Sequence, residues 1–209
     1  MAQILSIGNR ALEISNRVLT APAEEGRFVE IGGRKYPYVQ IGTQLWMAEN
    51  LDWKVSGIGI GGSQTGNANA WYYNNDEATY GINGNKFGLL YNFAAANIIA
   101  NALSSEWHIP TESEANALID KVRGDANVLK STLYWNNVGT NELDFSAVPS
   151  GYRGSSFEAY GKTCILRTST IYSGDAIKSI YLMDSGIVEV AGPNSSNVGL
   201  AIRLVRTLT

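Results

Sequence analysis

Residues 107–124, with the sequence WHIPTESEANALIDKVRG, contain the clearest secondary-structure signal in the chain. Thr111 and Glu114 have the spacing of a capping box, in which the threonine hydroxyl accepts the Glu114 N–H and the carboxylate reaches back to the Thr111 N–H. The apolar residues that follow share one helical face: Ala115, Leu118, Ile119 and Val122. The sequence therefore predicts a helix that begins after Thr111 and ends before Gly124.

The segments on either side of this helix predict an α+β arrangement. Apolar residues at helical spacing indicate another helix within residues 88–103. Residues 28–41 have the pattern of a hairpin around two glycines, and residues 44–47 form a further short strand. After residue 140 the chain has short strands and glycine turns, and the strand expected at 198–206 pairs with the early hairpin. Strands, then two helices, then strands are typical of an α+β domain with short twisted antiparallel sheets.

Two further segments are set apart by composition. Residues 54–70 are rich in Gly, Ser, Asn and Gln, which predicts a long loop of a kind that is usually functional or disordered. Residues 1–26 end in a linker-like APAEEG and have apolar residues at Ile4, Leu5, Ile7, Leu12 and Ile14. This N-terminal stretch fits either an extended arm or hairpin or a short helix, and it has too little mass for a core of its own. We divide the chain into an N-terminal arm and linker, 1–26, and a domain, 27–209. The arm is either a frayed terminus or an anchor to an assembly partner.

Charge and hydropathy exclude several partners. The net charge of −3 argues against a broad electrostatic grip on nucleic acid. No apolar run approaches the roughly 18 residues of a membrane span, so we expect no membrane insertion. The first residues, MAQILSIGNRALEISNR, lack the features of a secretory signal, and we expect synthesis and folding in a reducing cytoplasm.

The scarcity of reactive side chains argues against catalysis. His108 is the one histidine and Cys164 the one cysteine, so a disulfide and a His/Cys zinc site are both excluded. His108 has no nucleophile motif around it, and Cys164 is expected to be a partly buried, inert thiol. Asn74, Asn75, Asp76 and Glu77 offer oxygen ligands for calcium, although a loop braced by side-chain hydrogen bonds is the favoured interpretation. We therefore predict no catalytic residue, no metal ligand set and no cofactor, with calcium as the alternative.

Six motifs in order resemble one known family. They are VQIGTQLWMAENL (39–51), WYYNNDE (71–77), GLLYNFAAA (88–96), WHIPT (107–111), DFSAVPSGYR (144–153) and the closing stretch 198–206. In this order they resemble the Fibrobacter succinogenes major paralogous domain over about residues 27–206. That family looks like a branch of the formylglycine-generating-enzyme and C-type-lectin-like folds, so the resemblance implies a C-type-lectin-like fold preceded by an extended N-terminal arm. The chain departs from the family at 164–170, CILRTST, where members commonly carry a Trp-Trp-Ser-Ser-Thr-like string. The enzyme's chemistry uses paired cysteines, which one cysteine cannot supply.

The resemblance also implies a role. Many members are exported lipoproteins, but bacteriophage tropism proteins use a related lectin-like fold. We therefore expect a non-enzymatic virion protein, a fibre, tail or capsid decoration. Its arm would contact other virion proteins and its domain a host-surface glycan or protein, in a homo-oligomer. A domain that only decorates the particle fits nearly as well. The alternative is a bacterial cell-surface or secreted adhesin or carbohydrate-binding module.

Candidate ligand-binding residues are aromatic side chains and arginines in two regions. One group follows the long polar loop, and the other falls where lectin-like folds present their binding face. Such side chains combine a large contact area with a polar tip. The candidates are Trp71, Tyr72, Tyr73, Tyr152, Arg153, Phe157, Tyr160, Arg167 and Tyr172.

Overall fold

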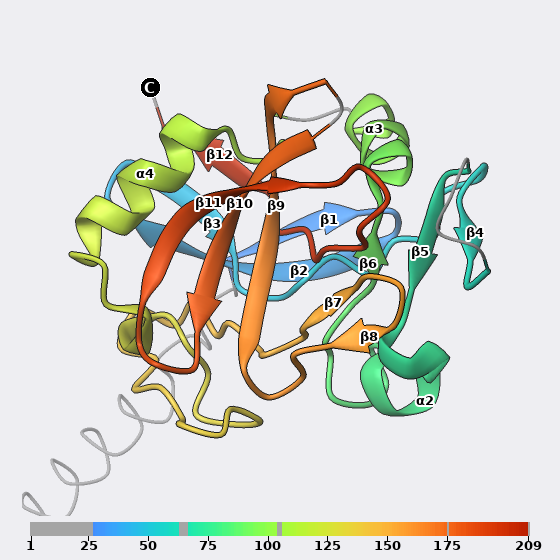
Figure 1. Ribbon diagram of the computed structural model, residues 1–209. Coiled ribbons are helices and arrows are strands. Elements are labelled where there is room, and N and C mark those ends of the chain that lie inside the picture. The colour runs from blue at the N-terminus through green and yellow to red at the C-terminus, as the bar shows by residue number, and fades with distance from the viewer. Residues whose placement is uncertain (1–26, 63–66, 104–105, 175, 209) are drawn as a thin grey trace, which may run out of the picture.

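The computed structural model describes residues 27–62, 67–103, 106–174 and 176–208, and Figure 1 shows their arrangement. In this part of the chain twelve strands form four sheets, and the α-helices are three short ones. The predicted α+β, C-type-lectin-like fold with two helices is therefore wrong, because strands predominate. The arm predicted for residues 1–26 lies outside the described residues.

The strands and helices have the following bounds. The strands are β1 (Phe28–Ile31), β2 (Arg34–Ile41), β3 (Gln44–Met47), β4 (Gly59–Ile60), β5 (Asn69–Trp71), β6 (Leu90–Tyr91), β7 (Tyr152–Arg153), β8 (Phe157–Glu158), β9 (Thr163–Ser173), β10 (Ala176–Met183), β11 (Val188–Asn194) and β12 (Val205–Thr207). The helices are α2 (Glu77–Tyr80), α3 (Phe93–Ala102) and α4 (Glu112–Lys121), with 3-10 turns η1 (Tyr73–Asn75) and η2 (Ala126–Val128).

The four-stranded sheet has the order β1-β2-β3-β12 and is antiparallel throughout. Its β1–β2 hairpin and its β3 strand confirm the predictions for residues 28–47. The closing strand is shorter than expected: it begins at Val205 and pairs with β3 rather than with the hairpin, with Val205 opposite Trp46. Upstream of it, Leu200 and Ala201 form isolated bridges with Tyr91 and Leu166.

The three-stranded sheet β11-β10-β9 accounts for the error in the fold prediction. Its strands are long, and β9 alone runs for 11 residues. In the sequence Arg167, Thr168 and Ser169 interrupt the apolar run of β9, and only short strands were expected after residue 140. The interruption is only apparent, because Arg167 and Thr168 are buried and their backbone continues the strand.

The helices differ from prediction mainly in their limits. α4 confirms the helix and the capping box at Thr111 and Glu114. α3 begins only at Phe93, because the Asn92 side chain caps its first turn and residues 90–91 belong to β6. The unpredicted α2 has four residues, too few for any periodicity, and is capped by Asp76. In Figure 1 α4 and α3 lie on opposite sides of the view, and α2 lies close to β8.

Residues 200–205 separate two parts of the core. Ala201 and Val205 belong to the cluster under α4 and the β9–β11 sheet, together with Trp46 and Leu118. Ile202 and Leu204 belong to the cluster under α3 and β1–β3. Both faces of this segment are buried, because every residue from Leu200 to Val205 is buried.

Candidate functional site

Five of the nine candidate residues meet on one side of the molecule. Trp71 ends β5 and Tyr73 begins η1, whereas Arg153 and Phe157 come from the β7–β8 ribbon and Tyr160 from the turn that follows it. The Arg153 guanidinium lies over two rings, with its Cζ 5.9 Å from the centre of Trp71 and 5.0 Å from the centre of Phe157. The ribbon thus brings residues 153–160 against the segment that follows the long polar loop.

Three of these residues, Tyr73, Phe157 and Tyr160, belong to an aromatic cluster of six rings. The rings are Tyr73, Tyr80, Phe87, Tyr134, Phe157 and Tyr160, and neighbouring centroids lie between 5.2 and 5.6 Å apart. Phe87 is buried at its base, whereas Tyr160 is 37% exposed and Tyr134 39% exposed. Edge-on and offset contacts of this kind hold rings rigid. The cluster therefore presents two tyrosines from a fixed aromatic base.

An unusual backbone conformation at Tyr134 positions its ring in this cluster. Its φ is +71°, in the left-handed region that a bulky residue seldom adopts. The conformation places its ring 5.2 Å from Phe87, and its hydroxyl donates to Asn85 Oδ1 at 3.1 Å. Tyr80, Phe87 and Tyr134 were not predicted as site residues, because they stand on loops and a short helix without periodicity.

A cleft lies on the other side of α2, and we call it the Asp52 cleft. Its volume is about 330 Å³, and its walls are Gly32, Asp52, Trp53, Lys54, Tyr72, Glu77, Ile82 and Asn83. Tyr72, the candidate residue between Trp71 and Tyr73, turns its ring into this cleft. Glu77 of α2 lines this cleft, and Tyr80 of α2 packs in the aromatic cluster, so one short helix contributes to both features.

Two buried tyrosine hydroxyls fix the floor of the Asp52 cleft. Tyr36 accepts the Asp52 backbone N–H at 3.1 Å, and Tyr91 accepts the Trp53 N–H at 2.8 Å. The Trp53 indole lies against the β1–β2 turn at Gly32, where a Cβ atom would stand 2.1 Å from Nε1. A glycine at this position is what allows the ring to approach the turn so closely.

The polar groups of the cleft are chiefly acceptors. The Tyr72 hydroxyl donates to Asp52 Oδ1 at 2.7 Å and has Glu77 Oε1 at 3.3 Å, while Lys54 Nζ pairs with Glu77 at 2.8 Å. Asp52 Oδ2 is buried without a hydrogen-bond partner among the described residues. Burial raises the pKa of Asp52, against the opposing effects of the Tyr72 hydrogen bond and the nearby cations. Burial and the Asp52 hydrogen bond raise the pKa of Tyr72. Aromatic walls beside the exposed carboxylate of Glu77 suit a neutral ligand rich in hydroxyl groups.

The remaining candidates lie elsewhere. Tyr152 donates to Glu158 Oε2 at 2.7 Å across the β7–β8 ribbon. Arg167 is 1% exposed within β9. Tyr172 is 55% exposed near the end of β9, where Lys178 Nζ lies 5.0 Å from its ring centre. The structure therefore separates these three residues from the aromatic cluster.

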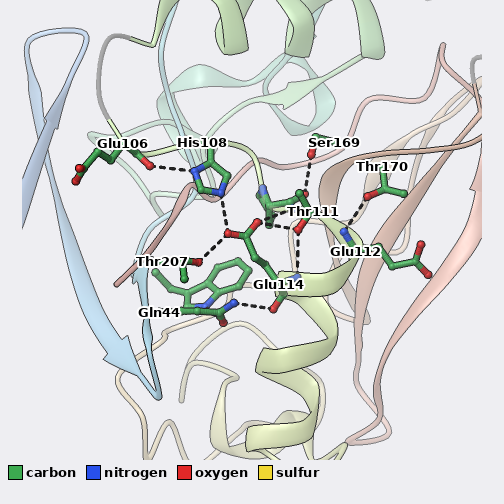
Figure 2. A network of polar contacts seen from close by, with 11 residues as sticks. Gln44, Glu106, His108, Thr111, Glu112, Glu114, Ser169, Thr170 and Thr207 are labelled. Atoms are coloured by element: carbon green, nitrogen blue, oxygen red, sulfur yellow. Dashed lines mark hydrogen bonds and ion pairs between the residues drawn. The ribbon is translucent and has the colours of Figure 1, made fainter. Parts of the chain in front are cut away.

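His108 belongs to a network that joins α4 to the sheet, as Figure 2 shows. Its Nε2 lies 2.8 Å from Glu114 Oε1, and its Nδ1 lies 2.9 Å from the Glu106 carbonyl oxygen. Both partners are acceptors, so the ring donates to both only when both nitrogens carry protons. The same carboxylate accepts from the Thr207 hydroxyl at 2.8 Å and from the Thr111 N–H at 2.9 Å.

This network ties the helix start to β12. Burial works to raise the pKa of Glu114, but the hydrogen bonds from Thr111, Thr207 and His108 outweigh it and hold the pKa below its ordinary value. Gln44 donates to the Glu114 carbonyl oxygen at 3.1 Å and accepts the Trp46 indole N–H at 3.0 Å. Together these contacts hold the start of α4 against β3 and β12, and His108 has a structural position in them.

The other reactive or ligating candidates also have structural positions. Cys164 is free and fully buried, and burial raises its pKa to about 11, which keeps the thiol protonated near neutral pH. Asp76 Oδ1 accepts the Thr79 N–H at 3.0 Å at the start of α2. Among the residues described, no group of three or more His, Cys, Asp and Glu side chains is placed to hold a metal ion. None of the described helices is long and apolar enough to cross a membrane.

Comparison with known proteins gives one match. The family model described as the Fibrobacter succinogenes major domain matches residues 39–206, from the middle of β2 into β12. No curated protein and no solved structure matches the chain. The matched range includes the aromatic cluster and all of the Asp52 cleft except Gly32.

Proposed function

The chain belongs to the Fibrobacter succinogenes major domain family, and from this premise we propose that it is a non-enzymatic structural protein of a bacteriophage virion whose domain binds the host surface. In this proposal residues 1–26 contact other virion proteins through Ile4, Leu5, Ile7, Leu12 and Ile14, and the virion holds several copies. Residues 27–208 present the binding surface.

The Asp52 cleft is the observation that carries the proposal. A saccharide ring has an apolar C–H face and a rim of hydroxyl groups. Trp53 and Tyr72 offer aromatic surface for the face, and the exposed Glu77 carboxylate and the Asn83 side chain offer polar groups for the rim. The aromatic cluster beyond α2 extends the contact area, since Tyr134 and Tyr160 are exposed there. These features support attachment to a surface glycan.

The non-enzymatic part of the proposal rests on the surroundings of the reactive groups. Both ring nitrogens of the one histidine form contacts in the network at the start of α4, and the one cysteine is a buried, protonated thiol. In the cleft, Glu77 is paired with Lys54, and Asp52 accepts a hydrogen bond from the Tyr72 hydroxyl. General acid–base work needs a group held against a reacting atom with a matched pKa, and these groups instead bind one another.

The binding test compares two isosteric variants of the full chain. The probe is a panel of immobilised bacterial lipopolysaccharides and capsular polysaccharides. Glu77→Gln replaces the exposed carboxylate of the cleft by an amide, and we expect a roughly 10–100-fold loss of affinity for any polysaccharide bound. Asp120→Asn makes the same charge change on the exposed side of α4 and is expected to bind normally. Equal affinity of the two variants would remove the cleft from the proposal.

A second experiment tests the virion assignment. Mass spectrometry of purified phage particles should detect the chain, and an Ile7→Asp, Ile14→Asp double variant should be lost from them. The cleft alone fits equally a bacterial cell-surface or secreted adhesin, the second candidate function. Recovery of the chain from the bacterial envelope, in cells without phage particles, would favour that candidate and count against the virion.

A further inference from the structure

A second pocket lies beside the turn of residues 81–86, and we call it the Tyr134 pocket. Its volume is about 280 Å³, and its walls include Glu49, Asn85, Lys86, Thr132, Leu133 and Tyr134. Tyr134 is 39% exposed, Leu133 59% and the Lys86 side chain 57%, so a ligand can reach all three from solvent. The pocket is close in size to the Asp52 cleft, and no described residue lines both.

The turn of residues 81–86 separates the two pockets. Ile82 and Asn83 line the Asp52 cleft. Asn85 and Lys86 line the Tyr134 pocket. Because consecutive Cα atoms are about 3.8 Å apart, the Cα atoms of Asn83 and Asn85 lie within about 7.6 Å of each other. The two pockets are therefore immediate neighbours, divided by this turn.

Hydrogen bonds hold this turn against the end of α2. The Gly84 N–H donates to the Gly81 carbonyl oxygen at 3.1 Å. The Asn85 N–H donates to the Thr79 carbonyl oxygen at 2.8 Å. Gly84 packs so closely that a Cβ atom there would stand 2.3 Å from the same Thr79 oxygen. The separation between the two pockets is therefore fixed by the fold.

The walls of the Tyr134 pocket concentrate unusual backbone conformations. Of the nine non-glycine residues with positive φ in the described part of the chain, four line this pocket. Two of them carry long side chains, Lys86 at φ +57° and Tyr134 at φ +71°, and the others are Asn141 and Ser146. Left-handed backbone is costly for bulky residues, and such strain clusters at binding sites. The fold thus holds the walls of this pocket in place against backbone strain.

The two pockets offer the same four kinds of group. Each has an aromatic wall, an exposed aliphatic side chain, an asparagine and a lysine–glutamate ion pair. In the Asp52 cleft these are Tyr72, Ile82, Asn83 and Lys54–Glu77, and in the Tyr134 pocket they are Tyr134, Leu133, Asn85 and Lys86–Glu49. The ion-pair distances are 2.8 Å in the first and 3.2 Å in the second, and Glu49 also contacts Arg34. Groups of the same kind on either side of a rigid turn suit a ligand whose own chemistry repeats.

We propose that the Asp52 cleft and the Tyr134 pocket are consecutive subsites for one extended polysaccharide, which crosses the turn of residues 81–86. This inference rests on the proposed function, since it takes the Asp52 cleft as a glycan site. It adds the class of glycan, a repeating chain bound along its length rather than a single terminal sugar. Once one subsite is filled, binding at the other is intramolecular, so a ligand that spans both gains affinity over a shorter one.

The test uses the polysaccharide of the panel that binds best, cut by partial hydrolysis into size-fractionated fragments. Titration calorimetry of the full chain is expected to show roughly 100-fold tighter binding of long fragments than of fragments of one or two sugars. Leu133→Ser should weaken the binding of long fragments by roughly 10-fold, because an exposed apolar contact is lost. Ile187→Ser makes a matched change at an exposed position that lines neither pocket, and it should bind normally.

A second variant and the cleft variant separate the outcomes. Tyr134→Asn removes the ring but keeps a residue that tolerates left-handed backbone, and it should weaken the binding of long fragments at least as much. If it does not fold, Leu133→Ser decides. Wild-type binding by Leu133→Ser, with weak binding by Glu77→Gln, would overturn the second subsite and leave the Asp52 cleft standing. Equal affinity for short and long fragments would also overturn it. If no polysaccharide of the panel binds the wild-type chain, the proposed function itself fails.

Discussion

Gly32 and Gly33 offer a paired test of how the Asp52 cleft is built. Both form the turn between β1 and β2, and both have positive φ, +60° and +78°. An alanine at either position costs about 1–2 kcal/mol for the left-handed backbone, partly offset by the stiffer unfolded chain. A Cβ at Gly32 would stand 2.1 Å from Trp53 Nε1, whereas a Cβ at Gly33 meets nothing within 4 Å. The difference between the two variants therefore isolates the packing of Trp53.

We expect Gly32→Ala to be less stable than Gly33→Ala by about 1–3 kcal/mol, the usual range for a side chain forced into filled space. Urea unfolding followed by circular dichroism gives the free energies, and tryptophan emission reports the displaced indole. Gly32→Ala should also lose polysaccharide affinity, since Trp53 forms a wall of the cleft. If the two variants have equal stability and equal affinity, the close approach of Trp53 to the turn has no role in either property.

Three further outcomes follow from the structure. Glu114→Gln should lose about 1–2 kcal/mol at pH 7, from the capping box and its charged hydrogen bonds. Burial opposes the effect, but the hydrogen bonds hold the folded pKa of Glu114 below its ordinary value of 4.5, so this loss of stability should vanish as the pH falls through that lower pKa. The control is Glu112→Gln, a charge-matched change in the same first turn, which should cost under about 0.5 kcal/mol in the same urea titrations. Cys164 should resist a thiol reagent at pH 8 in the native chain and react in urea, and rapid labelling of the native chain would contradict its burial. Since burial raises the pKa of Cys164 from 9.0 to about 11, its contribution to stability should be present below pH 9 and decline as the pH rises toward 11. Phe87→Ala should cost about 3–5 kcal/mol of stability, because the ring is buried at the base of the aromatic cluster. Tyr172→Ala, at an exposed position, should cost about 0.5 kcal/mol or less. If thermal unfolding shows equal losses for the two variants, the cluster adds little stability.

The parts of the fold that were predictable depend on neighbours in the sequence. Thr111 and Glu114 are three residues apart, so their capping box can be read directly and it holds in the structure. The hairpin of residues 28–41 has its turn glycines between two short apolar runs, and it also holds. α2 lacked such a signal, because a helix of four residues shows no period.

The candidate site was predictable only in part, because its contacts join distant segments. Composition alone selected Trp71, Arg153 and Phe157, which the β7–β8 ribbon brings together. The same reasoning passed over Asp52 as a wall of the cleft. Its position depends on the Tyr36 hydroxyl 16 residues away and on the Tyr72 hydroxyl 20 residues away. Such pairings follow from the register of the sheets, which no local pattern contains.

The two buried arginines show how contacts between distant segments place charged residues inside this core. A charged residue in an apolar run normally marks an exposed or interrupted strand, since an unpaired buried charge is costly. Arg203 is buried at lower cost because its guanidinium donates hydrogen bonds to carbonyl and amide oxygens 57 to 156 residues away in the chain. Arg167 is only partly hydrogen-bonded: it donates to two carbonyl oxygens 76 and 31 residues away, and two of its nitrogens have no acceptor among the described residues. At Arg167, compensation from such distances turns an apparent interruption into a central stretch of β9.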